Sequence, residues 1–196
     1  MTTHTMPYQT KYRGNPDVFG RVAVLFGGTS AEREISLQSG GAVLAGLQAL
    51  GVDAFAVDVQ NDVVAQLQSL VCDRAFIALH GAGGEDGKIQ ALLEWLNIPY
   101  TGSGIAASAV GLNKVSTKLQ WQGAGLPTPL FALLNDHSDI DETLASLGGN
   151  CFIKPASEGS SIGMQRVDNS AGMAAAYKLA KQYDAQVFAE KTIVGR

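Results

Sequence analysis

The segment RVAVLFGGTSAERE (residues 21–34) determines the first part of the fold. It starts as a short apolar run, reaches two glycines and continues into a helical pattern. Further apolar runs follow at residues 53–59 and 74–81, and a helical pattern returns at residues 88–96. Apolar strands that alternate with helices are typical of a parallel sheet covered on both faces. We therefore predict an α/β fold that begins with a Rossmann-like parallel-sheet domain over residues 21–104. The predicted apolar face of its first helix consists of Ile35, Ala42, Val43, Leu44, Leu47 and Leu50.

The second half of the chain has the pattern of an α+β unit. Helical sequence over residues 105–122 ends at a turn rich in glycine and proline, residues 123–129. The runs PLFALL, CFIK, IGMQRV and AQVFAEK read as strands, and they alternate with helical segments at residues 140–147 and 171–181. Prolines restrict their neighbours and glycines permit unusual dihedrals, so the turn indicates entry into a new sheet. We predict a second lobe over residues 105–189.

The composition is typical of a soluble globular protein. Hydrophobic residues make up 46% of the chain, and 14 basic against 18 acidic residues give a formal charge of −4. This charge does not favour nucleic acid, whose binding depends on surplus cations. No run approaches the ~20 apolar residues of a membrane span, and residues 1–20, predicted as a flexible extension, lack a signal-peptide core. We expect a cytoplasmic protein. Cys72 and Cys151 lie far apart in apolar surroundings, which favours buried thiols over a disulfide or metal site.

Candidate binding residues in the first half follow the predicted strands. In open α/β sheets, ligands bind at the carboxyl ends of the strands. The segments GGTSAERE and ALHGAGGEDG lie at two such ends. At the helix start, Thr29 with Glu32, or Ser30, can form an ordinary cap. A Glu32 carboxylate left free there could hold a substrate ammonium. His80 is either catalytic or a buried structural imidazole, and its loop does not fit the GxGxxG pattern.

Lysines supply the candidates in the second half. The segment FIKPASEGSSIGM (residues 152–164) has Lys154 at the end of an apolar strand, followed by a loop of glycines and serines. A cation, backbone amides and hydroxyls together suit a phosphate chain, and the alternative is a mobile hairpin turn with a surface lysine. Lys114 and Lys118 share one helix face, where both could be solvated. The AEK segment at residues 189–191 ends another strand, where an exposed edge is the alternative.

Five separated blocks of the sequence together indicate a family. They are VAVLFGGTSAEREISLQSG, FIALHGAGGEDGKIQALLEWLNIPYTGSG, LNKVSTKLQWQGAGLPTP, FIKPASEGSSIGM and FAEKTIVG. In this order they resemble the D-alanine-D-alanine ligases of the ATP-grasp superfamily, over residues 21–196. The resemblance implies a pre-ATP-grasp domain followed by the first α+β lobe of an ATP-grasp domain. It also implies ATP-dependent ligation of two D-alanines through an acyl phosphate, for peptidoglycan synthesis, with Mg²⁺ as cofactor and a homodimer as the assembly.

The resemblance implies roles for the matching residues. Glu32 would bind the ammonium of the first D-alanine, His80 would lie close to it, and Ser160 would link the loop to this site. Lys114 and Lys154 would hold the ATP phosphates. The other expected ATP contacts are Glu158, Gly159, Ser161 and Gly163 in the closing loop and Glu190, Lys191 and Ile193 at the adenine. Phosphoryl transfer depends on charge neutralisation and alignment, and a closed loop protects an acyl phosphate from water.

The sequence departs from the family pattern at two places. Asn113 precedes Lys114 where aspartate is more usual. The resemblance also stops where the family's final lobe begins, with residues 190–196 as its start. That lobe carries the metal ligands and the contacts to the second substrate, so no metal ligand is assigned, and we expect this chain alone to be inactive. The alternatives are a ligase that joins D-alanine to another D-amino or D-hydroxy acid such as D-lactate, a nucleotide-binding fragment without catalysis, and a partial product with no folded function.

Overall fold

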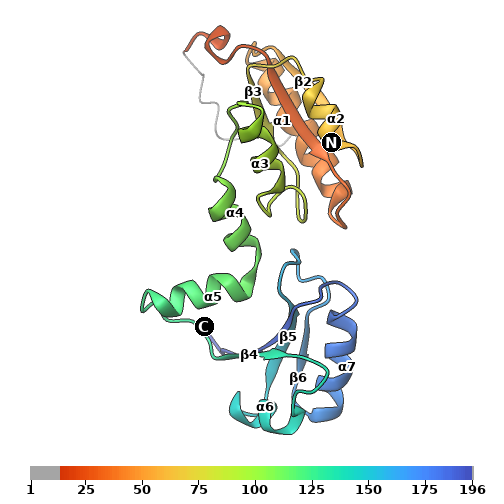
Figure 1. Ribbon diagram of the computed structural model, residues 1–196, viewed down its shortest axis with the longest axis vertical. Helices are drawn as coiled ribbons and strands as arrows, with labels where there is room; N and C mark the ends of the chain where they lie inside the picture. Colours follow the sequence, from red (N-terminus) through yellow and green to blue (C-terminus); the bar gives the residue numbers. More distant parts are fainter. Residues whose placement is uncertain (1–13, 196) are drawn as a thin grey trace, which may run out of the picture.

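The computed structural model describes residues 14–195 and shows two α/β units, one at each end of an elongated molecule (Figure 1). Helices α4 (Ile105–Leu112) and α5 (Lys114–Gly123) run between the units. Most of the predicted N-terminal extension, residues 1–13, lies outside the described residues. The next residues form a short 3-10 helix, η1 (Pro16–Phe19), and Phe19 packs against the first core. No helix between residues 14 and 195 combines the length and the apolar character needed to cross a bilayer.

The first unit is a parallel sheet in the order β2-β1-β3. Its strands are β1 (Val22–Gly27), β2 (Ala54–Val59) and β3 (Arg74–Ile77), and Val22 pairs with Ala54 on one side and Arg74 on the other. Helix α1 (Arg33–Ala49) covers one face, while α2 (Val63–Gln68) and α3 (Lys88–Trp95) cover the other. Both faces are therefore buried, as the continuous apolar strands predict.

The buried face of α1 matches the prediction only in part: Val43, Leu44 and Leu47 pack against the core of the sheet as predicted, but other positions differ. Ile35 and Leu50 are each 50% exposed, whereas Ser36 and Gly40 are buried. A Cβ atom on Gly40 would lie 2.3 Å from the Phe26 side chain. The helix approaches the sheet so closely at its start that only small residues fit there, and larger apolar side chains are left outside. Hydrophobic periodicity cannot indicate such a contact, because small residues carry little of that signal.

The second unit is an antiparallel sheet in the order β4-β7-β5-β6. Its strands are β4 (Phe131–Leu134), β5 (Cys151–Pro155), β6 (Gln165–Val167) and β7 (Val187–Lys191). Helices α6 (Ile140–Ser146) and α7 (Ser170–Ala180) pack on one face of the sheet, and α5 contributes to a small core on the other. A parallel unit followed by an α+β unit confirms the predicted fold class.

Three details of the prediction were different in the structure. The strand expected at residues 162–167 begins only at Gln165, because residues 162–164 form a turn in which Gly163 has φ +67°. Strand β3 ends at Ile77, before the predicted end. Helix α2 was not predicted. Both cysteines are free thiols, Cys151 buried and Cys72 half-buried.

Candidate functional site

The first part of the site lies where the strand order of the parallel sheet reverses. The chain passes from β1 to β2 on one side and then to β3 on the other. Crevices that bind ligands in open α/β sheets lie at the carboxyl ends of the strands at this kind of position. Gly28 follows β1, and His80 follows β3 by a few residues. The two polar candidates of the first half, Glu32 and His80, are therefore brought together by sheet topology.

Glu32 has a buried carboxylate that plays no part in capping α1. It occupies the N-cap position without a side-chain cap, and the Ser30 hydroxyl accepts the Glu32 backbone N–H instead. Only 8% of Glu32 is exposed. Its Oε2 lies between two glycines, since a Cβ on Gly81 or on Gly159 would come within 2.8 Å of it. Its Oε1 accepts a hydrogen bond of 2.7 Å from Ser160 Oγ in the second unit.

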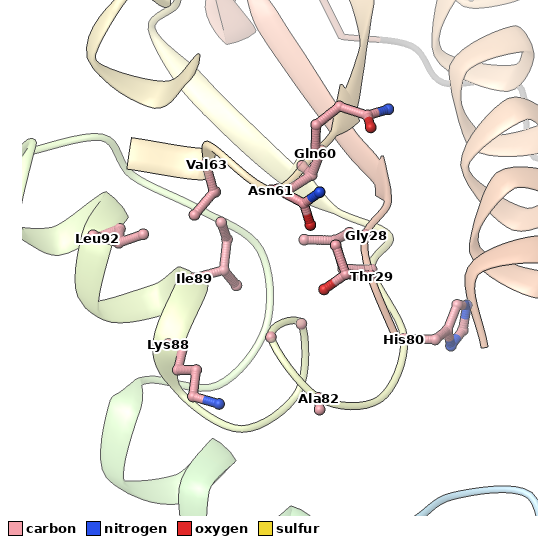
Figure 2. Close-up of a pocket in the computed structure, with 14 residues that line it drawn as sticks. Gly28, Thr29, Gln60, Asn61, Val63, His80, Ala82, Lys88, Ile89 and Leu92 are labelled. Carbon is pink, nitrogen blue, oxygen red and sulfur yellow. The ribbon is translucent and has the colours of Figure 1, made fainter. Parts of the chain in front are cut away.

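His80 is half-buried and is held by its backbone and by its ring. Its carbonyl accepts a hydrogen bond from Ser30 Oγ at 2.8 Å, and its Nε2 lies 2.8 Å from Ser39 Oγ on α1. Figure 2 shows a cavity of about 270 Å³ beside this segment, with the His80 imidazole turned away from the other labelled residues. Glu32 is not among the residues that line this cavity. The imidazole thus faces α1, although His80 is among the residues that line the cavity.

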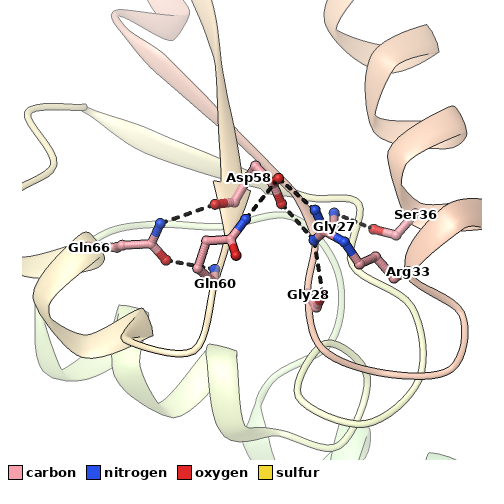
Figure 3. A network of polar contacts seen from close by, with 7 residues as sticks. All are labelled: Gly27, Gly28, Arg33, Ser36, Asp58, Gln60 and Gln66. Atoms are coloured by element: carbon pink, nitrogen blue, oxygen red, sulfur yellow. Dashed lines mark hydrogen bonds and ion pairs between the residues drawn. The ribbon is translucent and has the colours of Figure 1, made fainter.

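An ion pair fixes the loop that carries Glu32 (Figure 3). Arg33 donates to both carboxylate oxygens of Asp58 at 2.8 and 2.7 Å, and it also donates to the Gly28 carbonyl at 3.0 Å. Gln60 adds a further hydrogen bond to Asp58. The hydrogen bond from Arg33 lowers the pKa of Asp58 from its usual value. The start of α1, the end of β2 and the turn after β1 are therefore tied together next to Glu32.

The second part of the site is a buried network of ions on one face of the antiparallel sheet. Lys118 is 4% exposed, donates to Glu190 Oε1 at 2.5 Å and to Thr128 Oγ1 at 2.7 Å, and lies over the Phe131 ring. Lys154 pairs with the other oxygen of Glu190. Burial acts to raise the pKa of Glu190, but hydrogen bonds from the two lysines outweigh it, so the pKa lies below its usual value.

This network corrects two expectations from the sequence. The expectation that Lys118 is solvated is wrong, because the residue is 4% exposed. The expectation of an exposed strand edge at Glu190 is also wrong, because its side chain is 16% exposed. Strands β5 and β7 are neighbours, so Lys154 and Glu190 lie diagonally across the ladder on the same face. Helix α5 lies over that face and buries Lys118. The only feature of the sequence that pointed to a shared site for these lysines was the spacing of four residues between Lys114 and Lys118.

Lys114 lies where the two units meet. Its ammonium donates to the Glu158 carbonyl, and its backbone N–H donates to the Ala156 carbonyl at 2.8 Å. Burial lowers the pKa of Lys114, and the nearby charge of Lys154 adds to the effect. Lys114 and Lys154 both line two cavities, one of about 330 Å³ under the loop at residues 158–163 and one of about 460 Å³ beside Glu190. The two lysines therefore converge on one region.

Asn113, where the resemblance leads us to expect aspartate, uses both ends of its amide. Its Oδ1 caps α5 by accepting from Ser116 N at 2.8 Å. Its Nδ2 donates to Ser157 Oγ at 3.2 Å and to Gln186 Oε1 at 3.1 Å. A carboxylate can only accept, so it could bond Ser157 only by accepting the hydroxyl proton and could not bond Gln186 Oε1. Asn113 thereby links the start of α5 to the beginning of the serine-rich loop.

The loop at residues 158–163 has an unusual backbone. Ser160 and Ser161 have φ values of +48° and +62°, in the left-handed region that residues other than glycine seldom occupy. Such positions cost about 1–3 kcal/mol each and persist where surrounding contacts enforce them. The contact of Ser160 with Glu32 and the packing of Gly163 on Tyr183 are two such contacts. Burial raises the pKa of Glu158, with smaller contributions from Asp184 and Glu32.

Two predicted adenine contacts lie away from this region. Lys191 follows Glu190 on β7, so its side chain points to the opposite face of the sheet, where it lies beside Gly148. Ile193 is 63% exposed and does not line either lysine cavity. No local pattern in the sequence indicates the contacts of Ser39 and Thr128 or the Arg33–Asp58 pair.

The sequence matches two models of one family. The model described as "D-ala D-ala ligase N-terminus" matches residues 62–103, and the one described as "D-ala D-ala ligase C-terminus" matches residues 120–196. A D-alanine-D-alanine ligase of Saccharophagus degradans is 56% identical over 192 residues, which cover 98% of this chain and 61% of the relative. One from Ectopseudomonas mendocina is 55% identical, with 92% of this chain and 58% of the relative covered. The chain thus spans about three fifths of the length of these relatives.

Solved structures give the same result. The D-alanine-D-alanine ligase of Bacillus anthracis superposes with a TM-score of 0.81 at 31% identity, covering 89% of this chain and 58% of that chain. The same enzyme complexed with ATP has a TM-score of 0.78 at 29% identity, covering 89% and 59%. These neighbours have the ATP-grasp fold. Two family models, close relatives along nearly the whole chain and a shared fold lead to one conclusion. The chain belongs to the D-alanine-D-alanine ligase family.

Proposed function

We propose that this chain supplies the first-substrate site and the ATP phosphate site of an ATP-dependent D-alanine-D-alanine ligase. The observation that carries the proposal is the contact between Glu32 and Ser160. It joins a buried carboxylate of the first unit to the loop that also lines the cavity of Lys114 and Lys154. An amino-acid site and a polyanion site would then be neighbours, as transfer of a phosphoryl group to a carboxylate requires.

Glu32 binds the ammonium of the first D-alanine in this proposal. A carboxylate that is 8% exposed and accepts one hydroxyl bond keeps further acceptor capacity for a cation. Charge-assisted hydrogen bonds of this kind are roughly twice as strong as neutral ones. Ser160 shares the carboxylate and so couples the loop to the occupied site. His80, one residue before the glycine that touches Glu32, lies close to the same substrate.

Lys114 and Lys154 hold the phosphates of ATP. A phosphate chain between them would offset both the burial and the mutual repulsion that lower the pKa of Lys114. Lys154 would have to exchange part of its contact with Glu190 for a phosphate oxygen. Positioning and charge neutralisation account for most of the catalysis of phosphoryl transfer, so no protein nucleophile is needed.

The reaction has two steps. A carboxylate oxygen of the first D-alanine attacks the γ-phosphorus of ATP, the bond to the β-phosphate oxygen breaks, and ADP leaves with the bonding pair. The neutral amine of the second D-alanine then attacks the acyl carbon, inorganic phosphate leaves, and the amine proton passes to the phosphate. The loop at residues 158–163 covers the acyl phosphate in between and excludes water. The names of the relatives favour D-alanine over D-lactate as the second substrate.

The remaining parts of the proposal rest on the family resemblance. The product serves peptidoglycan synthesis, the protein is cytoplasmic and works as a homodimer, and ATP enters as its Mg²⁺ complex. Among residues 14–195, no three side chains of His, Cys, Asp or Glu are grouped so that they could hold a metal ion. We therefore assign no residue to Mg²⁺, and neither step above depends on one.

The test is phosphate release from ATP by the natural gene product with and without D-alanine. Lys154→Ala should abolish most of the D-alanine-dependent release, because one of the two phosphate cations is gone. Lys178→Ala, an exposed lysine on α7, is the matched control and should retain full activity. Equal rates for the two variants would remove Lys154 from the phosphate site. Absence of any D-alanine dependence in the unmodified protein would overturn the assigned activity.

A further inference from the structure

We propose that Ser39 is a positioning residue that holds neutral His80 in the tautomer with Nε2 protonated, which leaves Nδ1 as the acceptor of the ring. The tautomer follows from contacts within this chain alone. The use of His80 at the first-substrate site rests on the proposed function, so the two parts are tested separately.

The tautomer follows from the hydrogen bonds of the Ser39 hydroxyl. Its Oγ lies 2.9 Å from the Ile35 carbonyl oxygen and 2.8 Å from His80 Nε2, with the Ser36 carbonyl at 3.4 Å. A hydroxyl has one proton, and a carbonyl oxygen can only accept. The proton must therefore point to a carbonyl, as serines within helices commonly arrange. His80 Nε2 must then donate to Ser39 Oγ. If Ser39 Oγ donated to His80 Nε2 instead, its oxygen would lie 2.9 Å from the Ile35 carbonyl oxygen with no proton between them.

The position of Ser39 is fixed by the residue one turn earlier on α1. Ser36 is fully buried, accepts from Gly27 N at 2.9 Å and donates to the Ala78 carbonyl at 2.7 Å. These two bonds hold α1 against the ends of β1 and β3. Ser39 lies on α1, and α1 is bonded to Ala78, two residues before His80. The short contact between Ser39 and His80 therefore joins two segments that are already held together.

The tautomer determines what His80 can offer to a substrate. Gly81, which follows His80, lies so close to Glu32 that a Cβ on it would meet Oε2 at 2.8 Å, so the backbone that carries the imidazole borders the carboxylate. With Nε2 occupied by Ser39, neutral His80 presents a lone pair at Nδ1 and no N–H donor. An acceptor next to a carboxylate suits an ammonium or a hydroxyl and does not suit the carboxylate end of an amino acid. Ser39 would therefore contribute to how the first substrate is oriented, without touching it.

The tautomer is measured by imidazole ¹⁵N NMR on this chain, at a pH where histidine is neutral. His137 is exposed and serves as the internal reference for the mixture that solvent gives. We expect His80 to show only the Nε2–H pattern, Ser39→Ala to bring it towards the pattern of His137, and Ser39→Thr, which keeps the hydroxyl, to restore it. A wild-type His80 with Nδ1 protonated, or a pattern that Ser39→Ala leaves unchanged, would overturn the proposal.

The positioning role is measured by steady-state kinetics of the natural gene product. Ser39→Ala should raise the KM for D-alanine at the first site by roughly twofold to tenfold, the range that corresponds to one hydrogen bond. The KM for ATP should stay the same, and Ser39→Thr should recover the wild-type value. An unchanged KM for D-alanine would rule out the positioning role. Failure of the proposed ligase activity would give a different result. The unmodified protein would then show no D-alanine-dependent phosphate release, while the NMR pattern of His80 would stay as expected.

Discussion

The two units of this protein keep a charged side chain away from water in different ways. In the first unit, the Glu32 carboxylate lies between the backbones of Gly81 and Gly159 and receives one hydroxyl bond from Ser160. In the second unit, the carboxylate of Glu190 receives two ammonium groups, and one of these belongs to a lysine that is 4% exposed. Among the described residues the Glu32 carboxylate forms no direct ion pair, although the charge of Lys114 acts on it, whereas the Glu190 carboxylate already has its counter-charges in contact.

The difference indicates which group is set aside for a ligand and which is structural. A buried carboxylate without a direct ion pair is an energetic cost that a bound ammonium would relieve. A carboxylate between two lysines is satisfied, and the two ammonium groups, of Lys118 and Lys154, exceed its charge by one. The site would thus have one half that attracts a cation and another that attracts an anion. Five predictions about the two units follow, in order of decreasing expected effect.

The largest effect is expected for Glu190→Gln. The change leaves Lys118 buried without its counter-charge and close to Lys154, and breaking a buried pair in this way costs about 3–5 kcal/mol. Urea unfolding of the chain, followed by circular dichroism, measures the loss. Asp136→Asn is the control, because its pair with Lys181 is exposed and should change the urea midpoint little. Equal losses in the two variants would mean that the network of the second unit is not buried in solution.

The same network predicts an acid dependence of stability. The folded pKa of Glu190 is below its usual value, so its carboxylate contributes stability above the unfolded pKa. That contribution should be lost as the pH falls through the folded pKa. Glu190→Gln should lack this part of the acid-induced loss.

A smaller effect is expected for Gly81→Ala in the first unit. Gly81 has φ +67°, and a Cβ there would meet Glu32 Oε2 at 2.8 Å, so strain and overpacking together cost about 2–4 kcal/mol. Gly83→Ala is the matched control, since Gly83 has φ +87° but open space around a Cβ. It should lose only the strain, about 1–2 kcal/mol. If the two losses are equal, Glu32 does not pack against the backbone of Gly81.

Ser36→Ala should destabilise the chain by about 1–3 kcal/mol. The change removes the hydroxyl that satisfies the Gly27 N–H and the Ala78 carbonyl, and it leaves both groups buried without a partner. Thermal or urea unfolding measures the effect. Ser146→Ala removes an exposed serine hydroxyl that donates to the Thr143 carbonyl and should stay within about 0.5 kcal/mol of the parent. A neutral Ser36→Ala would show that α1 is held to the sheet by apolar packing alone.

The smallest effect concerns a carboxylate and a hydroxyl at the surface of the first unit. Tyr100 donates to Glu94 Oε1 at 2.6 Å, and this bond raises the pKa of Tyr100 to about 12. Glu94→Gln should return the pKa towards 10, as measured by the absorbance of the phenolate against pH. Tyr100→Phe identifies the signal by removing the last phase of the titration. If Glu94→Gln leaves the titration unchanged, the hydrogen bond between Tyr100 and Glu94 is not formed in solution.

Much of the fold was predictable because the signals for it are local. The change from apolar strands with helices to an α+β pattern located both units, and the glycines after β1 indicated the carboxyl edge of the sheet. The break between α4 and α5 is local as well, since asparagine is a common helix cap and Asn113 caps α5. The close contact of Ser36 and Gly40 on α1 with the sheet was not predictable, because small residues contribute little to the hydrophobic pattern.

The sequence by itself determined the order of the elements, the class of the fold and the residue types available for a site, because these depend on short-range periodicity and turn chemistry. Only the tertiary structure decided which of those residues meet. Glu32 and Ser160 are 128 positions apart, Lys118 is buried by the sheet beneath α5, and Lys191 faces away from Glu190. The reason is physical. Burial, register and hydrogen-bond partners are set by contacts between distant segments, and no window of the sequence contains both partners.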